Sequence, residues 1–141
     1  MLKRFTLKNY KNFKDEIMID FDSVAGYQFN TDCISDGLLG KMIIYGSNAT
    51  GKTNLGKALL DIVSAIFGIT RNANNGVLLN ADSKEDVAKF SYEFRFQDTD
   101  LTYKYSRCSN QELREEELHI NGIRIFRCDF DAEEYDFENL S

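Results

Sequence analysis

Gly46-Ser47-Asn48-Ala49-Thr50-Gly51-Lys52-Thr53 is the stretch on which the expected fold depends. It fits the pattern GxxxxGK[ST], in which glycines let the backbone curl so that successive N–H groups face a phosphate. Residues 42–45, just before it, are all apolar, which predicts a short, buried central strand. After it, apolar residues recur at spacings of three and four as far as Phe67, which predicts an amphipathic helix that ends at Gly68. The sequence therefore predicts an α/β fold in which a strand, a phosphate-binding loop and a helix follow one another.

The loop pattern assigns a role to individual side chains. Lys52 is expected to reach the β- and γ-phosphates of a nucleotide, and Thr53 to place its hydroxyl on Mg²⁺. The start of the helix near Gly51 would add unpaired N–H groups and the positive end of the helix dipole. The alternative is a glycine-rich turn that binds nothing. The candidate nucleotide-binding residues are Gly46, Ser47, Asn48, Ala49, Thr50, Gly51, Lys52, Thr53 and Asn54, and Thr53 is the candidate metal ligand.

Alternation of apolar and polar residues predicts an antiparallel β layer beside this unit. Asn121-Gly122 is a strong signal for a hairpin turn, because both residues accept a positive φ. The stripe from Phe90 to Phe96 is expected to be the buried face of a strand rather than a base-stacking platform. The expected strands are residues 2–10, 17–22 (paired with 2–10 as a hairpin), 90–96, 101–106, 116–120 and 123–127, with loops at 23–40 and 70–86.

Composition limits the class of protein. The chain has 141 residues, 43% hydrophobic and 28% charged, so one domain with a packed core is expected over residues 1–141. No apolar run approaches the ~20 residues that span a bilayer, which excludes a transmembrane protein. Three cysteines, odd in number and far apart, predict neither a disulfide framework nor a metal site, and favour a cytoplasmic protein. The net charge of −6 gives no support for nucleic-acid binding by the overall field.

Three stretches together resemble one family. Ile44-Tyr45-Gly46-Ser47-Asn48-Ala49-Thr50-Gly51-Lys52-Thr53-Asn54-Leu55 closely resembles the GxNxxGKSNLL loops of ABC-type ATPase heads. This group includes SMC proteins, RecF and the OLD-like, AAA-annotated ATPases of bacterial defence systems. Leu7-Lys8-Asn9-Tyr10-Lys11-Asn12-Phe13-Lys14 resembles the opening of such heads, and the aromatic meander from Phe90 to Gly122 resembles a later part.

The resemblance implies ATP and Mg²⁺ as cofactors, a homodimer of two heads, and ATP hydrolysis in the complete protein. That hydrolysis would drive action on DNA or control an effector nuclease, in DNA repair or antiviral defence. Lys11, Asn12 and Phe13 become candidate nucleotide-binding residues, because they match a loop that lies near the adenine and phosphates in related heads. The alternative for these three is an ordinary solvated hairpin turn.

Such heads also need a Walker B strand ending in Asp-Glu, a signature motif and usually a switch histidine, and this sequence has none of them. Residues 17–20 mimic a Walker B strand but precede the loop, so they are expected to be a hairpin strand. The chain therefore resembles the N-terminal lobe of a longer ATPase and is expected to hydrolyse no ATP alone. The rival hypothesis is a non-catalytic module that senses nucleotide or uses it to stabilise a complex. A small-molecule kinase is disfavoured, because only Arg71 is near enough to act as a lid arginine.

The other candidates are weaker. His119 has no cysteine or acidic partner at metal-ligand spacing and is expected to be a half-exposed strand residue. Residues 129–138 are acidic but lack the glycine of a calcium-binding loop, so a solvated helix or tail is expected. Residues 115–117 are the only glutamates that a hairpin could swing towards a γ-phosphate, and they are not expected to reach it. Gln97 and Gln111 both fit the glutamine of a Q-loop, and the sequence does not choose between them.

Overall fold

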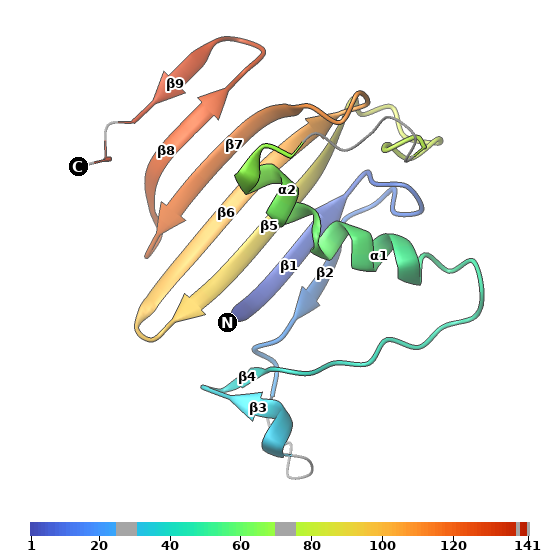
Figure 1. The fold of residues 1–141 in the computed structure, drawn as a ribbon, viewed down its shortest axis with the longest axis vertical. Helices are drawn as coiled ribbons and strands as arrows, with labels where there is room; N and C mark the ends of the chain where they lie inside the picture. Colours follow the sequence, from blue (N-terminus) through green and yellow to red (C-terminus); the bar gives the residue numbers. More distant parts are fainter. Residues whose placement is uncertain (25–30, 70–75, 138, 141) are drawn as a thin grey trace.

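A seven-stranded sheet with two short helices on one face forms the body of the protein (Figure 1). The computed structural model describes residues 1–24, 31–69, 76–137 and 139–140. The strand order is β2-β1-β5-β6-β7-β8-β9, and every neighbouring pair is antiparallel. The strands are β1 (Leu2–Lys8), β2 (Ile17–Asp20), β5 (Val87–Phe96), β6 (Thr99–Cys108), β7 (Leu113–Ile120), β8 (Ile123–Asp129) and β9 (Glu134–Asp136).

The predicted α/β fold is wrong. Residues 42–45 form no strand and make no backbone hydrogen bond to the described part of the chain. They run as an extended connection in which Ile43 is 74% and Tyr45 85% exposed. A buried central strand needs neighbours on both sides, and every strand of the main sheet is paired with strands other than this segment. The described chain is a largely antiparallel sheet with a helical layer, not a strand–loop–helix lobe.

The predicted single helix is divided in two. Helix α1 (Lys52–Leu59) and helix α2 (Asp61–Phe67) meet at Leu60. The chain leaves α2 at Gly68, whose φ of 61° confirms the predicted end. Helix α1 packs Leu55 and Ala58 on the sheet as expected.

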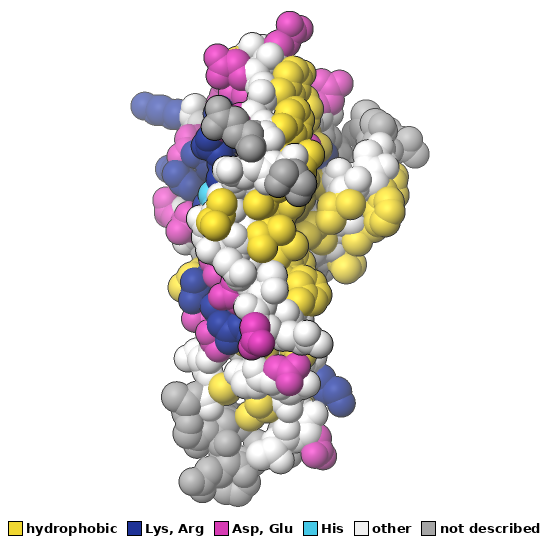
Figure 2. All heavy atoms as spheres, turned by 90° about the vertical axis from the view of Figure 1, so that its left-hand side faces the viewer, with side chains coloured by type: hydrophobic (Ala, Val, Ile, Leu, Met, Phe, Trp, Pro, Cys, Tyr) yellow, Lys and Arg dark blue, Asp and Glu magenta, His cyan; other side chains and the backbone are white. Residues whose placement is uncertain are grey.

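The predicted apolar stripe holds only in part for α2: Ile62 packs against the core, but this helix also turns Asp61 and Ser64 to the sheet. Polar partners on β6, described below, bind these two side chains, so Val63, Ile66 and Phe67 face outward. Figure 2 shows hydrophobic side chains gathered on the side that carries the helices, with charged side chains on the other side.

The antiparallel meander confirms the strand predictions. Asn121 and Gly122 have φ values of 49° and 78° in the turn between β7 and β8. Phe90 and Tyr92 are buried under the helices, where the Tyr92 hydroxyl donates to the Ala58 carbonyl over 2.6 Å. The aromatic stripe is therefore core, although Phe96 at its end is 55% exposed.

Three further segments differ in how far they match the sequence prediction. Residues 129–138 contain strand β9 paired with β8 instead of a helix or free tail. The expected loop at 23–40 contains the short 3-10 helix η1 (Thr31–Cys33) and a small hairpin of β3 (Ile34–Ser35) and β4 (Leu38–Leu39). Residues 76–86 are loop as expected, whereas Arg71 lies outside the described residues. No helix in the described ranges is long and apolar enough to cross a membrane.

Candidate functional site

The loop before α1 has a backbone that only certain residues tolerate. Ala49 and Gly51 have φ values of 65° and 94°, the left-handed conformation that turns successive N–H groups towards one side. A Cβ on Gly46 would lie 2.8 Å from Oγ1 of Thr50, whose hydroxyl donates to the Ser47 carbonyl over 2.8 Å. The backbone conformation therefore requires glycine at position 51, whereas a Cβ at position 46 would force the Thr50 hydroxyl to move.

Lys52 folds back over this loop. Its Nζ donates to the carbonyls of Gly46 and Ser47, each over 2.5 Å. No carboxylate among the described residues forms an ion pair with it, so its positive charge is uncompensated at the loop. Helix α1 starts at the same place with Gly51 as N-cap and no side-chain cap, which leaves the first N–H groups of the helix open to an anion.

A hollow of about 340 Å³ lies beside the loop and the start of α1. Its volume is at the lower end of the range for small-molecule sites. None of its lining residues is acidic, and amide, hydroxyl and ammonium groups dominate them. They are Asn12, Asn48, Ala49, Gly51, Lys52, Thr53 and Asn54.

The turn between β1 and β2 forms the second wall of this hollow. The Asn54 Nδ2 donates to the Asn12 Oδ1. The ring of Phe13 lies so close to Gly51 that a Cβ there would be 3.1 Å from Cζ. Asn12 and Phe13 are thus at the loop, as expected, although they are far from it in sequence.

Lys11 does not join them. Its Nζ donates to the Val77 carbonyl over 3.3 Å and lies 5.9 Å from the centre of the Tyr10 ring. The residue lines a separate hollow of about 100 Å³. Gln111 lines the same small hollow from the β6–β7 turn, whereas Gln97 is in the β5–β6 turn at the opposite end of these strands. Of the two glutamines, Gln111 is the one nearer to the loop region.

Two asparagines behind the turn were missed by the sequence reasoning. Asn9 is fully buried with φ of 54°, and Asn80 binds the backbone of the turn. The available signal was an asparagine near the end of the strand predicted at residues 2–10, since asparagine adopts positive φ more easily than other non-glycine residues.

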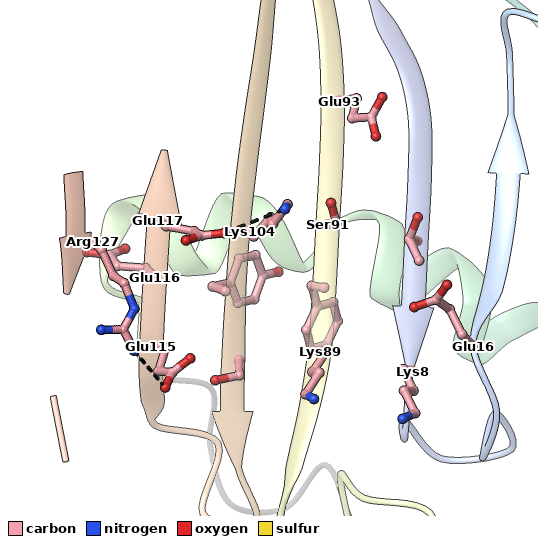
Figure 3. A pocket seen from close by; sticks show the side chains of 14 residues that line it. Lys8, Glu16, Lys89, Ser91, Glu93, Lys104, Glu115, Glu116, Glu117 and Arg127 are labelled. Carbon is pink, nitrogen blue, oxygen red and sulfur yellow. Dashed lines mark hydrogen bonds and ion pairs between the residues drawn. The ribbon is translucent and has the colours of Figure 1, made fainter. Parts of the chain in front are cut away.

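Glu115 and Glu117 cannot reach a nucleotide at the loop before α1. They line a hollow of about 520 Å³ on the helix-free face of the sheet, where Figure 3 shows both on the same side as Lys89 and Lys104. Glu117 pairs with Lys104 at 3.6 Å and Glu115 with Arg127 at 3.3 Å. Glu116 points to the other face but accepts a 2.7 Å hydrogen bond from Tyr103.

The two residues considered as metal ligands, His119 and Thr53, lie in different surroundings. His119 is a partly buried strand residue whose Nε2 lies 3.3 Å from Glu117 Oε1. Within the described ranges no three His, Cys, Asp or Glu side chains are grouped as metal ligands. Thr53, by contrast, fits Mg²⁺ held mainly by phosphate oxygens and water, because its hydroxyl is exposed in a hollow that supplies no carboxylate.

No protein-family model matches the chain, and no curated protein matches it either.

Proposed function

We propose that residues 46–54 bind the phosphates of ATP together with Mg²⁺. One observation carries this proposal: three features share a single hollow with no acidic lining residue. They are a loop with positive φ at Ala49 and Gly51, a lysine with no ion-pair partner among the described residues, and the uncapped start of helix α1. A polyphosphate is the ligand that such a set of donors favours. Lys52 would bind the β- and γ-phosphates, and Thr53 would bind Mg²⁺.

The proposal extends to Asn12 and Phe13, which form the opposite wall. The amides of Asn12 and Asn54 carry donors and acceptors beyond their mutual hydrogen bond, so both can bind polar groups of the ligand. The sequence resemblance to ABC-type heads supports ATP as the nucleotide. For a complete protein it also supports hydrolysis between two heads and action on DNA or an effector nuclease.

A binding-only module is the second candidate, favoured by the lack of a carboxylate among the described residues that line the hollow. Hydrolysis needs a group that orients or deprotonates the attacking water, and each missing group of this kind costs a factor of 10² or more. Phosphate release by the purified chain separates the two. Turnover of ~1–100 s⁻¹ that Lys52→Ala abolishes would establish an enzyme.

Calorimetry tests the proposal through its dependence on phosphate. ATP with Mg²⁺ and inorganic triphosphate with Mg²⁺ should both bind, whereas adenosine should not. If adenosine bound as tightly as ATP, recognition would rest on the nucleoside and the assignment of the loop would be wrong.

A further inference from the structure

Asn9 and Asn80 connect three segments that are far apart in sequence. The Asn9 Nδ2 donates to the carbonyls of Glu85 and Val87 over 2.9 and 2.8 Å, next to the start of β5. Its Oδ1 accepts from the Asn80 N–H over 3.2 Å. Asn9 is fully buried, so its own amide has no water as an alternative partner.

Asn80 also binds the turn between β1 and β2. Its Nδ2 donates to the Lys11 carbonyl over 2.5 Å, and the Lys11 N–H donates to the Leu78 carbonyl over 2.9 Å. The backbone of Tyr10 and Phe13 closes the turn with two 2.8 Å hydrogen bonds. The turn then meets the loop through Asn12 and Phe13, as described above.

We propose that Asn80, held by Asn9, is a positioning residue for the nucleotide site. It fixes the turn that holds Asn12 against Asn54 and Phe13 against Gly51, so its loss lets this wall of the site move. This inference rests on the proposed binding of ATP at residues 46–54.

The oxygen and the nitrogen of the Asn80 amide make different hydrogen bonds. Oδ1 accepts from the Asp82 N–H over 3.0 Å and so stabilises the local bend, while Nδ2 alone reaches the turn. Asn80→Asp keeps the acceptor and removes the donor. A residue with only a local structural role would tolerate this change.

Asn110 offers a matched control. Its Oδ1 accepts from the Glu112 N–H over 3.1 Å in a bend of the same kind, and its Nδ2 binds only the Glu112 side chain. Asn110→Asp therefore makes the same change from amide to carboxylate at a bend where the side-chain hydrogen bonds of residue 110 go to Glu112 and not to the 10–13 turn.

The test is calorimetry of ATP with Mg²⁺ on the wild-type protein and both Asp variants, with melting temperatures measured in parallel. Loss of one hydrogen bond predicts about 5- to 10-fold weaker binding for Asn80→Asp and no change for Asn110→Asp. The melting temperature of Asn80→Asp should stay within about 2 °C of wild type, because the bend remains capped. Asn80→Ala, which adds no charge, should weaken binding at least as much.

A double-mutant cycle with Asn12→Ala shows whether Asn80 acts through the turn. The two changes together should weaken binding less than the product of their separate effects. Unchanged affinity in Asn80→Asp, or fully independent effects in the cycle, would overturn the positioning role while leaving ATP binding in place. Absence of binding by the wild-type protein would overturn both.

Discussion

Gly51 and Gly56 lie five positions apart, yet their surroundings differ. Gly51 has φ of 94°, and a Cβ there would lie 3.1 Å from Phe13 and 3.3 Å from Asn12. Gly56 is inside α1 with nothing within 4 Å of where a Cβ would be. The first glycine is needed by the loop and the second is not needed by anything the structure describes.

Alanine at these two positions should therefore have opposite effects on the free energy of unfolding. Gly56→Ala should raise it by about 0.5–1 kcal/mol, because alanine has the higher helix propensity. Gly51→Ala should lower it by about 1–2 kcal/mol, because an L residue is strained at this φ. Urea denaturation measures both, and a stabilising Gly51→Ala would show that the loop does not hold this conformation.

At the scale of elements, a buried ion pair joins α2 to β6. The Arg107 Nε donates to Asp61 Oδ2 over 2.8 Å, and a second guanidinium nitrogen donates to Ser64 Oγ over 3.0 Å. The Tyr105 hydroxyl donates to the same carboxylate oxygen over 2.8 Å. Asp61 and Arg107 are only 2% and 7% exposed, so neither charge has water as an alternative partner.

Removing one member of this pair should be costly. Asp61→Ala leaves the Arg107 charge buried without its partner and should lower the free energy of unfolding by about 3–5 kcal/mol. Glu117→Ala, which breaks the exposed pair with Lys104 on the open face, should cost less than about 1 kcal/mol. Chemical denaturation compares them, and equal losses would mean that the buried pair does not hold α2.

Tyrosines in the same layer predict a loss of stability at high pH. Burial, with smaller effects of neighbouring groups, raises the pKa of Tyr92, Tyr103 and Tyr105 well above the usual 10.0. The folded state keeps these hydroxyls protonated where unfolded tyrosines ionise. The free energy of unfolding should thus be unaffected by them below about pH 10 and fall as the pH rises further.

Urea denaturation across this pH range measures the effect, and tyrosinate absorbance of the folded protein checks its origin. Tyr92→Phe removes one of the three groups and should make the fall with pH shallower. A free energy of unfolding that stays constant above pH 10 would contradict the burial of these hydroxyls.

Local patterns predicted the elements whose cause is local. The Asn121-Gly122 hairpin, the strand containing Phe90 and Tyr92, and the helix end at Gly68 all follow from short-range rules. The prediction of a strand at residues 42–45 was wrong, because apolar residues alone do not supply a neighbouring strand to pair with. The predicted orientation of α2 was wrong in part, because Asp61 binds Arg107, which lies 46 positions away in the sequence. The same limit hid Asn80, whereas the loop itself could be predicted from its pattern.

At the scale of the whole molecule, the proposed phosphate site involves only a few segments. The loop and the start of α1 form one wall, and the β1–β2 turn, supported by Asn80, forms the other. The rest of the sheet provides the base on which the helices lie (Figure 1). Its helix-free face is lined by paired charges and takes no part in this site (Figure 3).

Calorimetry of ATP with Mg²⁺ on Lys52→Ala tests whether the loop at residues 46–54 binds phosphate. Among the described residues the Lys52 ammonium donates hydrogen bonds to the Gly46 and Ser47 carbonyls alone, so its loss should remove most of the affinity with little change in melting temperature. Lys57→Ala, which removes the same charge from an exposed position in α1, should bind ATP as the wild-type protein does. Equal affinity in the wild-type protein and Lys52→Ala would contradict the account, because ATP would then bind elsewhere.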